Sequence, residues 1–421
     1  MARIQKSALG SGISVITEEM PDVESSTIGI WVNTGSRNET GRLSGVSHFI
    51  EHLLFKGTDR RTALDISREI ESVGGVLNAF TSREYTCFYV KVLNKDLPLA
   101  IDLLSDIFLN SKFDRKEMEK EKLVVLQEIK MVEDTPDDII HDLFAERFWQ
   151  DHPLGWSILG SSETVKSMQR VDVTGYFRSH YHTGSVFVTA AGGLKHRRVA
   201  GLLNKTLGKL KKTGVTATTS APEPSPGVKL HKKKLEQVHL CFGVPVPPQP
   251  DPERYKVYLL NTILGSGMSS RLFQEIREKR GLAYSVYSYL NLCKDAGSLV
   301  TYAGTSSETF SAVVGLINKE YVKITEGVSA EELRNAKEQL KGGMLLGLES
   351  SDSRMTKLAR DEMYFGRVVP VKEIIREIDR VTARGIKAAA RRLFRPDRLT
   401  LVAIGNVDNK DLPKNLKKIL I

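Results

Sequence analysis

The apolar positions in the first third of the chain follow two periods, one of about two residues, typical of strands, and one of about 3.6 residues, typical of helices. The shorter period predicts strands at residues 13–17, 27–33, 76–80 and 84–92. The longer period predicts helices at residues 45–55, 63–73, 97–108 and 114–132, the last with Asp114 and Glu117 as a D-x-x-E start signal. Strand pairs followed by helix pairs indicate an α+β layer, with helices on one face of a largely antiparallel sheet.

A segment without an apolar period divides the chain near its middle. Residues 209–234 read KLKKTGVTATTSAPEPSPGVKLHKKK, with three prolines in five residues. Such a stretch cannot bury one face and is typical of an exposed tether. We therefore expect a first domain at residues 1–210, a linker at 211–228 and a second domain at 229–421.

The two halves resemble each other around a unit of helix, glycine and strand. Residues 65–80 read DISREIESVGGVLNAF, and residues 273–288 read FQEIREKRGLAYSVYS, so that Gly75 falls on Gly281 with an offset of 206. In both, an amphipathic helix ends at glycine before an apolar strand. The shared offset favours duplication over a chance match. The sequence thus predicts two homologous α/β-layer halves, each a mostly antiparallel sheet with helices packed on one face.

Composition and charge exclude several classes of protein. With 41% apolar and 27% charged residues, the chain is neither disordered nor collagen-like nor a coiled coil. The net charge of +10 is a mild excess for 421 residues. The basic residues at 229–234 have no interleaved aromatic residues, so we expect a solvated surface and no nucleic-acid partner.

The cysteines and the apolar runs bear on the compartment. Cys87, Cys241 and Cys293 lie far apart and form no C-x-x-C pair, which argues against a disulfide framework and a thiolate zinc finger. The first twenty residues contain no apolar signal region, and no run of ~18 apolar residues follows. A cytoplasmic location without membrane association is therefore expected.

One short segment, GVSHFIEHLLFKG at residues 45–57, carries candidate chemistry. On a helix, His48, Glu51 and His52 lie at 0°, 300° and 40°, at about 100° per residue, and share one face. Two imidazoles one turn apart can bind one zinc ion, and the carboxylate between them can act as a general base on a zinc-bound water. The pattern is H-x-x-E-H. Its apolar neighbours predict a largely buried helix, where unpartnered imidazoles are costly unless a metal or a polar site receives them.

A catalytic zinc site needs a third protein ligand. The predicted helix at 114–132 carries Glu121 and Glu128, seven residues and close to two turns apart, so they share a face. Either could complete the site. The many charges of this helix fit a solvent-exposed face equally well, and spacing alone does not choose between these readings.

The order of motifs along the whole chain resembles the insulinase/pitrilysin family of zinc peptidases, in particular the mitochondrial-processing-peptidase type and its short bacterial relatives. HFIEH is followed 76 residues later by Glu128 in EKLVVLQEIKM. The other matching stretches are GIWVNTGSRNE, VGGVLNAFTSREYTCFY, HPLGWSILG at 152–160 and GSGMSSRLFQEIREKRGLAYSVYS at 265–288.

The resemblance implies roles for residues of the first half. His48, His52 and Glu128 would be the zinc ligands and Glu51 the general base. Glu121 would orient the site from behind the ligands. Asn78 and Ala79 match an edge strand that pairs with the substrate backbone.

The resemblance also implies roles for the second half. Arg277 and Tyr284 match a pair that approaches the scissile region, and Gly265 and Gly267 match the glycine-rich loop of the family's noncatalytic subunits. The offset of 206 places His48, Glu51, His52 and Glu128 on residues that cannot bind zinc, namely Arg254, Val257, Tyr258 and Arg334. No H-x-x-E-H follows residue 209, so one zinc per chain is expected.

Together with the H-x-x-E-H segment, the resemblance implies a zinc-dependent endopeptidase that hydrolyses peptides or unfolded, presequence-like segments inside a closed chamber. The chain resembles only half of the long family members, so we expect a homodimer, or a heterodimer with a paralogue, to close that chamber. Two alternatives are a noncatalytic or substrate-presenting partner subunit and a zinc-binding protein without hydrolysis.

Overall fold

The computed structural model describes residues 3–211 and 219–414, which fall into two compact units. The first unit lies within Met1–Met131, Trp156–Thr219 and Gly347–Val368, and the second within Val132–Gly155, Ser220–Leu346 and Val369–Ile421. Of the predicted linker at 211–228, residues 212–218 lie outside the described residues.

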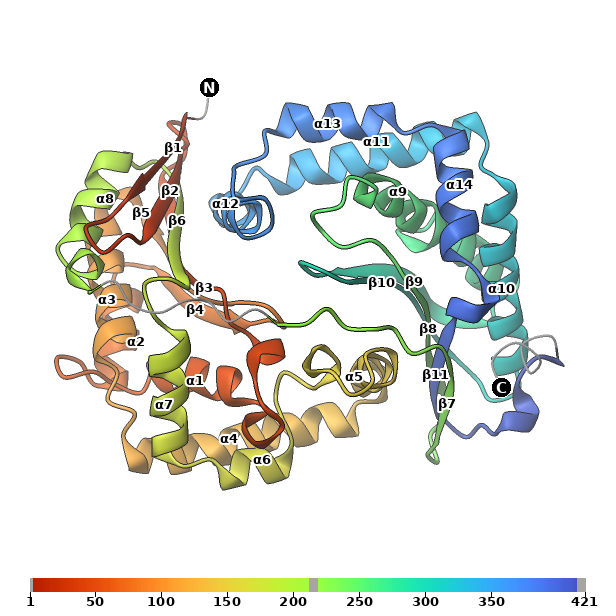
Figure 1. The fold of residues 1–421 in the computed structure, drawn as a ribbon, viewed down its shortest axis with the longest axis horizontal. Helices are drawn as coiled ribbons and strands as arrows, with labels where there is room; N and C mark the ends of the chain where they lie inside the picture. The colour runs from red at the N-terminus through yellow and green to blue at the C-terminus, as the bar shows by residue number, and fades with distance from the viewer. Residues whose placement is uncertain (1–2, 212–218, 415–421) are drawn as a thin grey trace. The chain divides into compact units, whose positions relative to one another are not determined.

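The first unit is built on a six-stranded sheet (Figure 1). Its strands follow the order β1-β2-β6-β3-β5-β4, and only β2 and β6 run parallel. The strand β4 therefore stands at an edge, with no described strand on its other side. The bounds are β1 (Arg3–Ala8), β2 (Ser14–Glu19), β3 (Ser25–Val32), β4 (Val76–Thr81), β5 (Thr86–Leu93) and β6 (Val186–Gly192).

Helices pack on one face of this sheet around a large apolar core. They are α1 (Val46–Leu54), α2 (Ala63–Glu71), α3 (Leu97–Asn110), α4 (Arg115–Asp134), α6 (Ser162–Ser167), α7 (Arg170–His180) and α8 (His196–Asn204). The predicted start signal of α4 is confirmed, because Asp114 Oδ1 accepts hydrogen bonds from the backbone N–H groups of Lys116 (2.8 Å) and Glu117 (3.2 Å).

The second unit contains a five-stranded sheet and its own apolar core. The strand order is β7-β11-β8-β10-β9, with bounds β7 (Gly227–Lys232), β8 (Val238–Pro245), β9 (Ala283–Leu292), β10 (Gly297–Thr305) and β11 (Thr400–Gly405). Its helices are α5 (Pro136–Phe148), α9 (Arg254–Gly265), α10 (Phe310–Glu326), α11 (Ala330–Gly347), α13 (Val371–Arg380) and α14 (Ala383–Leu393). One helical turn, η6 (Phe273–Glu278), precedes β9.

The two sheets repeat one topology. The order β2-β6-β3-β5-β4 corresponds to β7-β11-β8-β10-β9, and in each sheet the first two of these strands form the parallel pair. This repetition confirms the predicted α+β class with two homologous, mostly antiparallel sheets.

A single helix covers the second face of each sheet, and it comes from the opposite half of the sequence (Figure 1). In the first unit, α12 (Ser351–Phe365) packs on β2, β3 and β6, where Met355 and Leu358 join the buried Trp31. In the second unit, α5 packs on β8 and β11. Each unit therefore contains one helix that a division of the chain into two consecutive domains would place in the other unit.

Three local details differ from the sequence analysis. The strand β7 occupies residues 227–232, inside the stretch 209–234 that was described as lacking an apolar period. Val228 and Leu230 alternate there with polar residues and pack against the core. The glycine with a left-handed backbone after α2 is Gly74 (φ +65°) rather than Gly75, so Gly74 is the counterpart of Gly281 (φ +62°). The strand β1 was not predicted, because its few apolar residues are partly exposed.

Within the described parts of the chain, no helix combines the length and the apolar character that crossing a bilayer requires.

Candidate metal centre

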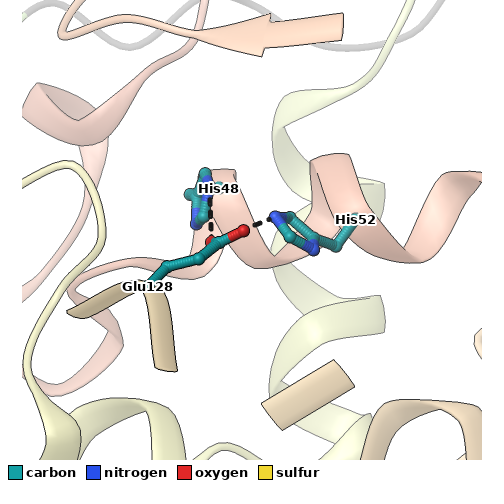
Figure 2. A group of neighbouring side chains, drawn as sticks. All are labelled: His48, His52 and Glu128. Carbon is teal, nitrogen blue, oxygen red and sulfur yellow. Dashed lines mark ion pairs between the residues drawn. The ribbon is translucent and has the colours of Figure 1, made fainter. Parts of the chain in front are cut away.

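Two helices of the first unit bring three of the predicted residues together. His48 and His52 extend from α1, and Glu128 extends from α4 toward both imidazoles (Figure 2). Glu128 Oε2 lies 3.7 Å from His48 Nε2 and 3.5 Å from His52 Nε2, and the two rings are 4.6 Å apart between their centroids.

The distances between these nitrogen and oxygen atoms, and the hydrogen bonds that they lack, fit a bound zinc ion. Two ligand atoms that each lie about 2.0–2.1 Å from a tetrahedral zinc are roughly 3.3 Å apart, close to the nitrogen–oxygen distances seen here. Among the described residues, the buried Glu128 Oε2, which faces both imidazoles, has no hydrogen-bond partner. Because unpartnered buried polar atoms are costly, this arrangement favours a bound cation. In the described residues, no other group of three such side chains converges in this way.

The protonation state of His48 also suits a metal ligand. Burial and, to a smaller extent, the neighbouring His52 lower its pKa to about 4. The imidazole is therefore neutral at neutral pH, with a free lone pair for a cation.

The structure distinguishes Glu128 from Glu121, which the sequence spacing alone left as equal candidates for the third metal ligand. Glu128 faces both imidazoles, whereas Glu121 Oε2 lies 3.2 Å from His52 Nδ1, on the far side of that ring. Glu121 is buried, and its Oε1 forms an ion pair with Lys56 Nζ at 2.7 Å. Glu121 is thus placed to hold His52 with its Nε2 toward Glu128.

Glu51 lies in the same turn of α1 as both imidazoles. Its Oε2 accepts a hydrogen bond of 2.5 Å from Thr81 Oγ1, at the end of β4. Burial raises the pKa of Glu51, and the nearby Glu128 carboxylate adds to the rise, whereas Thr81 and His52 lower it. The net upward direction suits a group that takes up a proton near neutral pH.

The start of α1 is fixed by a carboxylate that the sequence did not reveal. Glu39 accepts hydrogen bonds from the backbone N–H groups of Gly45 (2.7 Å) and Ser47 (2.8 Å). Gly45 has φ +91°, and a Cβ there would lie 2.5 Å from the carbonyl oxygen of Leu159. Glu39 lies within the GSRNE stretch of the sequence, but no spacing rule indicates that it reaches this helix.

Glu39 predicts a specific dependence of stability on pH. Burial raises its pKa to about 7 from 4.5, although both backbone N–H groups lower it. A carboxyl group with a raised pKa in the folded state adds stability below pH ~4.5, and this contribution is lost as the pH rises through 7. We expect the wild type to lose on the order of 3 kcal/mol of unfolding free energy, relative to Glu39→Gln, between pH 4.5 and 7.5. Urea unfolding of both proteins at several pH values measures this difference. Parallel pH curves would contradict the assignment.

The projection with an offset of 206 does not follow the helices of the second unit. Most buried positions of α1 fall on buried positions of α9 with an offset of 210, as Phe49 does on Leu259. The two buried residues of α11, Leu333 and Ala336, fall on the buried Met118 and Glu121 of α4 with an offset of 215. The counterparts of His48, Glu51, His52, Glu121 and Glu128 are then Tyr258, Asn261, Thr262, Ala336 and Gly343. A cavity of about 280 Å³ lies between α9 and α11, with Thr262 and Ala336 in its wall.

The other predicted site residues lie on β4, on η6 and β9, and at the end of α9 and in the loop that follows it. Asn78 and Ala79 lie on the edge strand β4, where Asn78 Oδ1 accepts a hydrogen bond from the backbone N–H of Ala79. In the second unit, the Arg277 guanidinium lies 5.0 Å from the ring centroid of Tyr284, whose side chain is 82% exposed. Gly265 ends α9, and Gly267 has φ +109°.

Comparison with protein families gives two consecutive matches. Residues 14–162 match the family described as insulinase (peptidase family M16), and residues 167–340 match the one described as peptidase M16 inactive domain. The candidate ligands all lie in the first match.

Curated relatives and solved structures match nearly the whole chain. The chain is 39% identical to the Bacillus subtilis protein named uncharacterized zinc protease YmxG, over 94% of this chain and 96% of that one. It is 38% identical to a Mycobacterium leprae protein named uncharacterized zinc protease, over 99% of this chain and 95% of that one. A peptidase M16 inactive domain from Pseudomonas fluorescens shares the fold, with a TM-score of 0.90 at 20% identity over 98% of this chain and 100% of that one. A protease from Helicobacter pylori also shares the fold, with a TM-score of 0.89 at 21% sequence identity, over 96% of this chain and 100% of that one.

Proposed function

Because the chain belongs to the insulinase family of peptidases (family M16), we propose that it is a zinc-dependent endopeptidase that hydrolyses peptides or unfolded segments. One observation carries this proposal: His48, His52 and Glu128 converge from two helices, with the Glu51 carboxylate in the same turn. A chain that only presented substrate to a partner would not need all four groups in this arrangement.

Each residue of the candidate site has a separate role in the proposed hydrolysis. His48, His52 and Glu128 would hold one zinc ion, which, when bound, supplies Lewis-acid chemistry by polarising the scissile carbonyl and lowering the pKa of a coordinated water. Glu51 takes a proton from the attacking water and delivers it to the leaving amine. Glu121 keeps His52 in the orientation that presents Nε2.

Substrate binding uses the open edge of the first sheet. An extended peptide would pair with β4 at Asn78 and Ala79, where main-chain hydrogen bonds give affinity with little demand on sequence. In the proposed dimer, the exposed Tyr284 and the neighbouring Arg277 of one chain would donate hydrogen bonds to the carbonyl or backbone of a substrate bound by the other chain. The loop around Gly265 and Gly267 of that same chain would contact the rest of this substrate. The closed chamber, its formation by two chains and the cytoplasmic location stay predictions.

The proposed activity is tested with a quenched fluorescent peptide. The protein as purified is assayed, then treated with phenanthroline, and then supplied again with zinc. We expect cleavage that stops with the chelator and returns with zinc. Absence of cleavage in the zinc-loaded protein, alone and with candidate paralogues, would contradict the proposal.

A further inference from the structure

The Glu51 carboxylate has one hydrogen-bond partner among the described residues, and that partner lies on a different element. Thr81 Oγ1 donates to Glu51 Oε2 at 2.5 Å, and no other hydrogen bond reaches either carboxylate oxygen. A hydroxyl that donates to a carboxylate over such a short distance makes a strong hydrogen bond. The contact therefore decides which of the two oxygens is held and which is free.

Fixing one oxygen matters because glutamate has three rotatable side-chain bonds. A general base works only when the accepting oxygen lies within hydrogen-bond reach of the proton that it removes. With Oε2 held by Thr81, Oε1 is the oxygen left to receive a proton. Small losses of such orientation lower the reaction rate without weakening substrate binding.

The position of Thr81 links the base to the open strand edge. Thr81 is the last residue of β4, and its backbone pairs with Thr86 on β5. The opposite edge of β4 has no described partner strand and is where the proposed function places the substrate. The residue that holds Glu51 is thus part of the strand on which the peptide would dock.

We propose that Thr81 is a positioning residue that holds the Glu51 carboxylate from the substrate-docking strand. This inference rests on the proposed function, because it assigns Thr81 to the same reaction. It adds a group that neither the H-x-x-E-H spacing nor the charge pattern indicates. In this arrangement, the strand β4 would both bind the substrate peptide and orient the general base Glu51.

The test uses Thr81→Val, which keeps the shape and removes the hydroxyl, and Thr81→Ser, which restores the hydroxyl. In the zinc-loaded protein, we expect Thr81→Val to lower kcat at least tenfold with KM changed less than twofold. Thr81→Ser should keep at least a third of the wild-type kcat. In the Glu51→Gln background, Thr81→Val should lower kcat less than twofold further, because the two residues act as a unit.

A matched control removes a hydroxyl from the adjacent strand. Thr86 is buried and donates from Oγ1 to the backbone oxygen of Thr34, and no hydrogen bond among the described residues joins its side chain to Glu51. Thr86→Val should lower the thermal midpoint but change kcat less than twofold. An equal loss of kcat in Thr86→Val and Thr81→Val, or no rescue by Thr81→Ser, would overturn the proposal.

A second readout does not need activity. In the zinc-free protein, the shifts of the thermal midpoint caused by Thr81→Val and Glu51→Ala should not add in the double variant, because each variant removes the hydrogen bond between Thr81 and Glu51. Additive shifts would show that the contact is absent and overturn the proposal. If the wild type cleaves no peptide while the shifts are non-additive, the proposed function fails but the contact stands.

Discussion

Replacing Glu51 with glutamine is expected to lower kcat/KM by at least the ~10²–10⁴-fold typical of lost general acid–base catalysis. Glutamine has nearly the same shape but cannot take a proton from water. Burial and the neighbouring Glu128 raise the pKa of Glu51, so its carboxylate is a better base than an exposed glutamate. Glu51 is not among the three converging ligand side chains, so the variant should still contain zinc.

The experiment measures cleavage of a quenched peptide and zinc per chain in the same preparations. Glu71→Gln is the matched control, because Glu71 is an exposed residue of α2 outside the site. The control should cleave at the wild-type rate. If Glu51→Gln does so as well, Glu51 is not the general base. If it loses zinc, its role is structural.

The wild type is expected to bind one zinc ion per chain, and replacing His48 with alanine is expected to reduce this content to nearly none. The remaining His52 and Glu128 supply only two protein ligands, and structural and catalytic zinc sites have at least three. The neutral His48 imidazole also cannot be replaced by a neighbour, because no fourth histidine, cysteine or carboxylate of the described residues joins the cluster. Atomic absorption after dialysis against trace zinc measures the loss.

The control for this variant is His182→Ala. His182 lies two residues after His180 and so has a spacing that resembles a metal pair, but its Nδ1 accepts a hydrogen bond from the backbone N–H of Gly184. That variant should keep one zinc per chain. Full zinc content in His48→Ala, or loss of zinc in His182→Ala, would show that the metal is held elsewhere.

The part of the site on α1 was predictable because helical spacing is a local property. His48, Glu51 and His52 lie within five residues, and the angle per residue alone places them on one face. The choice between Glu121 and Glu128 was not available from spacing, because both lie on the inner side of α4. Only the packing of α4 against α1 separates them, with Glu128 toward both imidazoles and Glu121 behind His52.

The contacts that support the site depend on segments far apart in the sequence. Thr81 and Glu39 reach α1 from a strand and from a loop, and no periodic pattern connects them to it. The exchange of α5 and α12 between the sheets is equally invisible, because amphipathicity shows that a helix has an apolar face but not which sheet it covers. The offset of 206 failed at α9 and α11 because the connections differ in length between the two halves.

Anomalous diffraction at the zinc absorption edge, from crystals of the wild-type chain soaked in zinc, tests the central claim most directly. The account predicts one strong peak per chain, within about 2.0–2.2 Å of one nitrogen each of His48 and His52 and one oxygen of Glu128. A peak at other residues, or these three side chains too far apart to share one ion, would contradict it.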